Sequence, residues 1–102
     1  MEYQLIKWNR SVPPSENKIR EIYLAEGLNP YIWSNNAGDT YSAHSHSYHK
    51  VIYVVEGSIE WIFPHHDDHI ETYPGDRLDL AAGLVHAAKV GPTGVTCMEA
   101  HK

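Results

Sequence analysis

From residue 30 onward the chain consists of short apolar or alternating stretches separated by corners rich in glycine, proline and asparagine. In the stretch 58–63, Ile59, Trp61 and Phe63 alternate with Ser58 and Glu60, a period of two that is typical of a strand with one buried face. Residues 73–76, Tyr-Pro-Gly-Asp, suit a type II turn, because proline fixes φ at the second position and glycine accepts a positive φ at the third. Many short strands joined by such corners predict an all-β antiparallel sandwich or barrel.

The expected strands follow one another at regular spacing. In chain order they are an edge strand at residues 3–8, then 31–34, a strand that contains His44 and His46, and then 50–56, 58–63, 70–73, 77–81, 86–90 and 95–100. The stretch 50–56 is apolar enough to be buried on both faces. We expect its outward face to be covered by the N-terminal segment or by a second subunit.

One short helix is expected before the strands. Pro13-Pro14 interrupts the chain, Ser15 is a suitable N-cap for a helix of roughly eleven residues, and Gly27 falls just past its end. The apolar side chains Ile19, Ile22 and Tyr23 fall on one helical face together with Glu26, so this face is expected to pack on the outside of the barrel.

Length, charge and cysteine content limit the class of protein. A chain of 102 residues predicts one domain, with an N-terminal extension at 1–30 and a barrel at 31–102. The net charge is −5 and the 8 lysines and arginines are scattered, which argues against nucleic-acid binding. The longest apolar run is too short to span a bilayer, no secretory signal is apparent, and Cys97 is the only cysteine. We therefore expect a cytoplasmic protein, with Cys97 as a core side chain.

Histidine is unusually frequent, with 8 residues in the chain. His44 and His46 are two positions apart, and on an extended strand this spacing places both rings on the same face. His86 follows the glycine-rich corner at residues 82–83 and provides a third ring. Because imidazole is the commonest metal-ligating side chain, these three rings are the candidate ligands of a metal ion.

Two segments resemble the paired motifs of the cupin family. Gly38, His44, His46 and Gly57 match the spacing of the first motif, Gly-x5-His-x-His-x3-4-Glu-x6-Gly. Gly75, Gly83 and His86 match the second motif, Gly-x5-Pro-x-Gly-x2-His-x3-Asn. The resemblance covers about residues 38–90 and indicates a small single-domain, RmlC-like cupin.

The resemblance implies a jelly-roll barrel that binds a divalent metal ion through His44, His46 and His86, often as a homodimer. The ion would be zinc, manganese, nickel, copper or iron, because imidazole ligands suit all of these metals. Proteins similar to this one include dioxygenases, isomerases and decarboxylating enzymes, so the expected function is the binding or conversion of a small molecule.

Three positions depart from the family pattern. Ala81 and Val90 replace a structural proline and asparagine, whereas Lys50 replaces the glutamate that binds the metal. An ammonium group about 4 Å from the ion would be repelled by roughly 4 kcal/mol per charge pair at an effective dielectric constant of 20. Three outcomes remain open: Lys50 extends to the barrel mouth, which we favour, or it loses its proton, or the metal is bound weakly or not at all. At the mouth, Lys50 would attract an anionic substrate and is the candidate catalytic residue.

Two other function classes compete with a metal enzyme. The barrel could bind a ligand without turnover, as cupin sensor domains do, or it could be a metal-free protein in which Lys50 takes the place of the ion. Among the remaining polar residues, we expect His49 to face outward and His65, His66 and His69 to belong to a solvated loop with Asp67 and Asp68. Glu60 and Glu99 would supply a carboxylate if their faces point inward, while Tyr48, Tyr53, Trp61 and Met98 are expected in the wall and core.

Overall fold

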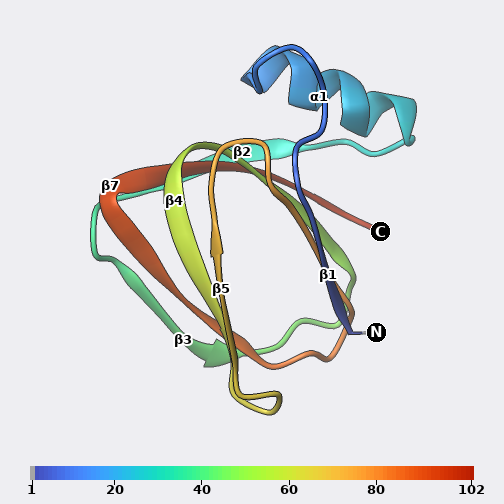
Figure 1. The fold of residues 1–102 in the computed structure, drawn as a ribbon. Coiled ribbons are helices and arrows are strands. Elements are labelled where there is room, and N and C mark those ends of the chain that lie inside the picture. The colour runs from blue at the N-terminus through green and yellow to red at the C-terminus, as the bar shows by residue number, and fades with distance from the viewer. Residues whose placement is uncertain (1) are drawn as a thin grey trace.

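A computed structural model describes residues 2–102 as a strongly curled antiparallel sheet with one helix packed on it (Figure 1). The elements in chain order are β1 (Tyr3–Ile6), α1 (Glu16–Ala25), β2 (Tyr31–Asn35), β3 (Thr40–His44), β4 (Lys50–Phe63), β5 (Asp68–Thr72), β6 (Arg77–Leu80) and β7 (His86–His101). Every strand pair is antiparallel, which confirms the predicted all-β jelly-roll class with a short N-terminal strand and helix. No helix within the described range is long and apolar enough to cross a membrane.

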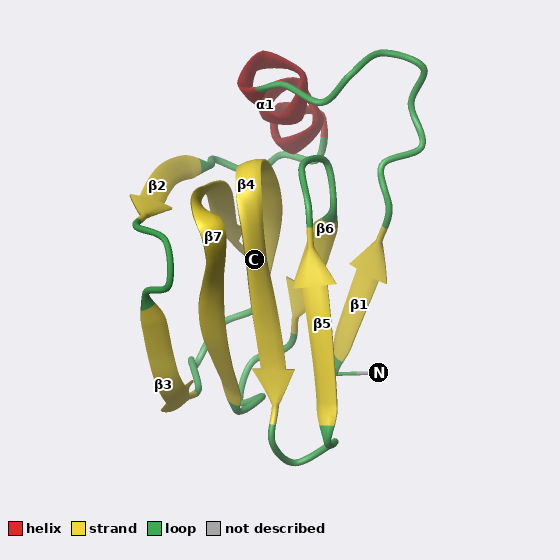
Figure 2. Ribbon diagram, turned by 60° about the vertical axis from the view of Figure 1, so that its left-hand side comes forward, coloured by secondary structure: helices red, strands yellow, loops and turns green. Residues whose placement is uncertain are grey.

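The two long strands β4 and β7 hold the barrel together. The strand order is β1-β6-β4-β7-β2, with β3 also pairing with β7 and β5 also pairing with β4. The first part of β4 lies between β6 and the end of β7, and its second part lies between β5 and the start of β7. Figure 2 shows β2 and β3 on one side of this pair, and β5, β6 and β1 on the other. The short strands thus close the barrel around its long central ladder.

Two breaks between strands that the sequence predicted are absent from the structure. The sequence predicted a break at Glu56 and Gly57 and another in residues 91–94, but β4 and β7 run through both regions as continuous strands. The ladder instead shifts register next to Gly57, which has φ +79°, and a Cβ atom there would collide with the carbonyl oxygen of Gly94. These two glycines bend the paired strands where their backbones approach closely, so they curve the barrel without ending the strands.

Alternation along β4 and β7 creates two apolar layers. On one face, these two strands, β6 and the loop after it fill the barrel interior with Ile52, Val54, Ile59, Trp61, Phe63, Leu78, Leu80, Leu84, Ala88, Val90, Val95 and Cys97. The opposite face contributes Val51, Tyr53, Met98 and Ala100 to a second cluster, which is closed by α1. This arrangement explains why residues 50–56 appeared apolar on both faces.

The helix α1 covers the outer apolar face through Ile19 and Tyr23, both fully buried. Its start is fixed by Ser15, whose hydroxyl accepts a hydrogen bond from the Lys18 amide at 3.2 Å, as predicted for an N-cap. The Tyr23 hydroxyl donates towards the carbonyl oxygens of Val51 at 2.8 Å and Met98 at 3.0 Å. The chain itself therefore supplies the cover that the sequence left open between a helix and a second subunit.

Candidate metal centre

The strand register brings two of the predicted ligands together. His44, the last residue of β3, lies directly opposite His86, the first residue of β7. Side chains that face each other across an antiparallel pair lie on the same side of the sheet, so both rings point into the barrel. His46 lies beyond the end of β3, which corrects the expectation that it shares a strand with His44. The loop after β3 nevertheless turns the His46 ring to the same place.

The three rings form a compact group. One nitrogen from each of His44, His46 and His86 lies within 4.8 Å of the other two. The ring centroids are separated by 4.7 Å for His44 and His46, 4.6 Å for His44 and His86, and 5.3 Å for His46 and His86. Among residues 2–102 this is the one cluster of three or more histidine, cysteine or carboxylate donors close enough to hold an ion.

Hydrogen bonds to backbone carbonyls orient two of the rings. His44 Nδ1 lies 2.6 Å from the Ser42 carbonyl oxygen, and His86 Nδ1 lies 3.0 Å from that of Leu84. A carbonyl oxygen only accepts, so Nδ1 carries the proton in both rings. In the neutral form, Nε2 then has a free lone pair, as a metal-ligating histidine requires.

The third ring provides the clearest test of fit to a metal ion. His46 Nδ1 lies 3.3 Å from the Tyr48 hydroxyl, whereas His46 Nε2 is buried and has no hydrogen-bond partner among the described residues. A buried polar atom without a partner is costly, and a bound cation would satisfy this one. The donor set and the unpartnered nitrogen therefore both fit a divalent ion ligated by three imidazoles.

Burial keeps two of the three rings in the protonation state that a metal needs. Burial lowers the pKa of His46, and the nearby charge of Lys50 lowers it further. Burial also lowers the pKa of His86, to about 4. Both rings are therefore neutral near neutral pH and available as ligands.

Lys50 does not extend to the barrel mouth as expected. Its Nζ lies 3.2 Å from Glu99 Oε2, and only 14% of the Lys50 side chain and 4% of the Glu99 side chain are exposed. The register explains this contact, because Lys50 lies opposite His101 and Glu99 is two residues away on the same face of β7. Lys50 thus points into the cavity, on the same face as expected from the strand pattern. There it forms a buried ion pair with Glu99.

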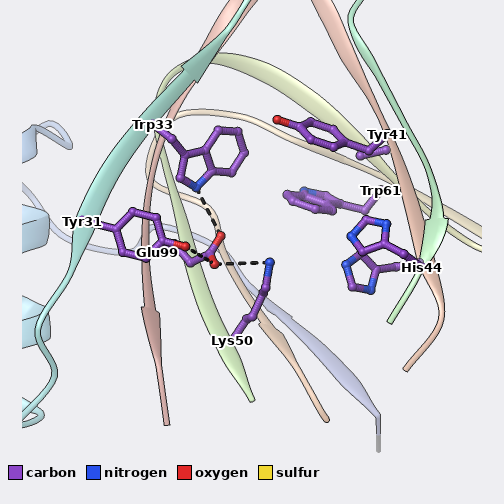
Figure 3. A pocket seen from close by; sticks show the side chains of 9 residues that line it. Tyr31, Trp33, Tyr41, His44, Lys50, Trp61 and Glu99 are labelled. Atoms are coloured by element: carbon purple, nitrogen blue, oxygen red, sulfur yellow. Dashed lines mark hydrogen bonds and ion pairs between the residues drawn. The ribbon is translucent and has the colours of Figure 1, made fainter. Parts of the chain in front are cut away.

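The ion pair and two of the three histidines, His44 and His86, line one cavity of about 240 Å³. Its wall is formed by Tyr31, Trp33, Tyr41, His44, Lys50, Trp61, His86, Ala88 and Glu99. Figure 3 shows the Lys50 ammonium beside the Glu99 carboxylate, with Tyr31 and Trp33 on one side of the view and Tyr41, Trp61 and His44 on the other. One chamber therefore combines a candidate metal centre, a paired ammonium and an aromatic lining.

The remaining sequence candidates lie elsewhere. Glu60 lies opposite Lys89 on the outer face and contacts His69, so it supplies no carboxylate to the cavity. His66 contacts Glu2, which agrees with a surface role for this loop histidine, whereas His69 and Asp68, also expected in the loop, lie in β5. Cys97 is fully buried, and burial raises the pKa of its thiol, as expected for a core side chain.

The sequence left Glu99 undecided and gave Tyr31 and Trp33 no role in the site. These residues come from β2 and the end of β7, where Tyr31 lies opposite Glu99 and Trp33 lies two residues further on the same face. The sequence predicted a strand at residues 31–34, but not its pairing with β7. Knowledge of this one register would have placed all three side chains in the cavity.

Two comparisons by sequence give no match, neither with protein-family models nor with curated proteins. Solved structures do match. A DUF861 family protein from Thermotoga maritima has a TM-score of 0.66 at 19% identity, covering 96% of this chain and 97% of that chain. A cupin superfamily protein from Desulfitobacterium hafniense has a TM-score of 0.63 at 15% identity, covering 97% and 75%. The chain has the cupin fold.

A further cupin neighbour is an enzyme of known activity. The DMSP lyase DddQ from Ruegeria pomeroyi has a TM-score of 0.66 at 21% identity, covering 74% of this chain. The present chain spans 38% of the length of that lyase. At these identities the likeness concerns the fold. It confirms the cupin resemblance of residues 38–90 as a structural one, and leaves the activity to be inferred from the residues of the cavity.

Proposed function

We propose that this cupin binds a divalent metal ion through His44, His46 and His86 and acts on a small molecule beside it. The observation that supports this most strongly is the convergence of three imidazole nitrogens within 4.8 Å, with His46 Nε2 buried and without a protein partner. Zinc, manganese, nickel, copper and iron all accept imidazole ligands, so the donor set is compatible with each of them.

The ion pair between Lys50 and Glu99 offsets the repulsion that Lys50 would exert on a metal ion in the cavity. A lone Lys50 ammonium would repel the ion, but Glu99 lies 3.2 Å from it and balances its charge. Three neutral imidazoles leave the double charge of the ion uncompensated, which favours an anionic ligand. When bound, the ion would supply Lewis-acid chemistry or, in the case of iron, oxygen activation.

The residues around the histidines support a small-molecule role. The cavity of about 240 Å³ is smaller than a drug-sized ligand site, so its occupant has few heavy atoms. Trp61, His44 and His86 form one part of its wall, while Lys50 offers a charged donor. We propose turnover of the dioxygenase or isomerase type, with Lys50 as the candidate catalytic residue. The alternative is a binding or sensor module that uses the same cavity without turnover.

Assembly and location belong to the same proposal. We propose a homodimer formed along the edge strand β2, where Tyr31 is 48% exposed and Ile32 44% exposed. Light scattering on the purified protein would test this, since a mass of one chain across micromolar concentrations would contradict it. We also propose a cytoplasmic location, with which a single buried thiol is compatible.

Elemental analysis of protein purified without a histidine tag tests the metal centre. We expect close to one metal ion per chain in the wild type and almost none in the double variant His44→Ala/His86→Ala. The matched control is His65→Ala/His66→Ala, which also removes two histidines but from the loop between β4 and β5, and should keep the metal. Equal metal content in all three proteins would contradict the site. No metal in the wild type, before or after addition of these divalent ions, would favour the metal-free alternative.

A screen of small anionic substrates then separates an enzyme from a binding module. Turnover by the metal-loaded wild type, lost in the double histidine variant, supports the enzyme. Saturable binding without product formation supports the module.

A further inference from the structure

The cavity contains two charged groups of opposite sign, Glu99 and Lys50. They differ in how many of their hydrogen-bonding positions are occupied. Glu99 accepts hydrogen bonds from the Tyr31 hydroxyl at 2.6 Å, from Trp33 Nε1 at 3.2 Å and from His101 Nε2 at 2.8 Å. With the Lys50 contact at 3.2 Å, its two oxygens have four neighbouring donors. Three of these donors lie at Oε2 and only Trp33 lies at Oε1, so Oε2 is fully used while Oε1 keeps one lone-pair site.

The hydrogen-bonding positions of Lys50 are used less fully than those of Glu99. An ammonium group has three N–H donors. The described residues give its Nζ one charged contact, Glu99, and a position 6.0 Å from the centre of the Tyr48 ring. The side chain is 14% exposed and lines the cavity, so its remaining donors face the chamber. Glu99 therefore holds the ammonium in place, while Lys50 retains free donors with which to bind an anion.

The walls between Lys50 and the histidines are aromatic. Trp33 and Tyr41 meet edge to face with centroids 6.4 Å apart, and Trp61 also lines the chamber (Figure 3). Such walls favour a flat, apolar body next to the charged end of a ligand. The small volume excludes a large ligand, and the free donors of one ammonium, whose charge Glu99 already balances, suit a singly charged carboxylate better than a doubly charged phosphate.

We propose that the cavity binds a small carboxylate with a flat, unsaturated or aromatic body, and that Lys50 is its anion-binding group. The carboxylate of the ligand accepts hydrogen bonds from the free donors of Lys50, and its body lies between Trp33, Tyr41 and Trp61. Glu99 is a positioning residue for Lys50. The inference names the substrate class of the proposed function, but the Lys50 contact itself does not require the metal.

Benzoate is the probe for this inference, with benzamide as its uncharged analogue and phenyl phosphate as its dianionic one. Binding is followed by calorimetry and by quenching of tryptophan fluorescence, since Trp33 and Trp61 line the cavity. Each titration is made on protein of known metal content and again after removal of metal with a chelator. The variants are Lys50→Met, Lys50→Arg and the control Lys89→Met, which removes an exposed lysine of β7 outside the cavity.

We expect the wild type and Lys89→Met to bind benzoate at least tenfold more tightly than benzamide. Lys50→Met should lose at least tenfold in benzoate affinity with little change for benzamide, and Lys50→Arg should recover part of the loss. Thermal unfolding of each variant verifies that it is folded. The inference is overturned if benzoate fails to bind the wild type at millimolar concentration, if folded Lys50→Met binds it equally well, or if phenyl phosphate binds tenfold more tightly than benzoate.

The two proposals fail in different ways. Benzoate binding that depends on Lys50 in protein without any metal site would support the carboxylate inference and contradict the metal centre. Metal binding through the histidines, together with benzoate binding that is unchanged in Lys50→Met, would support the metal centre and contradict the carboxylate inference.

Discussion

The substitution Glu99→Gln removes the negative charge that faces Lys50 while keeping the size and one acceptor oxygen of the side chain. At the observed 3.2 Å, the lost attraction is about 5 kcal/mol for an effective dielectric constant of 20. Relaxation and partial solvation of the ammonium reduce this, because the Lys50 side chain is 14% exposed. We therefore expect the free energy of unfolding to fall by about 3 kcal/mol, within the range for one partner removed from a buried pair.

Urea unfolding of a double-mutant cycle at pH 7 measures this cost. Lys50→Met should cost about 1 kcal/mol, because Glu99 keeps three other donors and only one hydrogen-bonding contact is lost. The double variant Lys50→Met/Glu99→Gln should recover part of the stability lost in Glu99→Gln alone. The expected coupling free energy between the two side chains is about 2 kcal/mol.

The pH dependence of the same pair provides a second readout. Burial alone would raise the pKa of Glu99, but hydrogen bonds from Tyr31 and His101 and the charge of Lys50 outweigh it and lower the pKa below its ordinary value of 4.5. Its contribution to stability is therefore complete above pH 4.5 and is lost as the pH falls through the lower, folded-state value. A coupling free energy below about 0.5 kcal/mol at pH 7 would refute the view that Glu99 holds a charged Lys50 in the cavity.

Three further predictions concern the fold. Burial lowers the pKa of His86 to about 4 from 6.5, so metal-free protein should lose stability as the pH falls from 6.5 to 4, and His86→Gln should flatten this part of a urea-monitored pH profile. Tyr23→Phe should cost about 1 kcal/mol in thermal unfolding, because the hydroxyl donates inside a buried contact between α1 and the sheet, and an unchanged Tm would contradict that role. Gly57→Ala should cost roughly 2 kcal/mol or more in urea unfolding, since its Cβ would collide with Gly94 and φ is +79°. The matched variant Gly38→Ala, with a similar φ but open space, should cost about 1 kcal/mol, and equal losses would refute the collision.

Local sequence patterns were sufficient to predict the fold class. Period-two alternation, the Pro74-Gly75 turn and the N-cap at Ser15 are set by neighbouring residues, and the structure has each of them. The same local patterns predicted strand ends at Gly57 and in residues 91–94, because glycine often marks the end of a strand. Here Gly57 lets the paired strands β4 and β7 approach closely and bend. This role depends on its partner Gly94, so the residues next to Gly57 in the sequence do not indicate it.

The site was only partly predictable for the same reason. The motif spacings led to the three histidines, and the structure brings these together, although His46 reaches the cluster from a loop. The pairing of Lys50 with Glu99 depends on the register between β4 and β7, across 49 positions of sequence. A substitution that looked incompatible with a metal ion was thus compensated by a distant residue that no local pattern indicates.

X-ray absorption spectroscopy of the zinc-reconstituted protein tests the three-histidine centre most directly. The expected spectrum shows one site per chain with three imidazole nitrogens at about 2.0–2.1 Å, and this signal disappears in His44→Ala/His86→Ala. A coordination sphere without imidazole, or the same spectrum from the double variant, would show that these rings do not bind the ion.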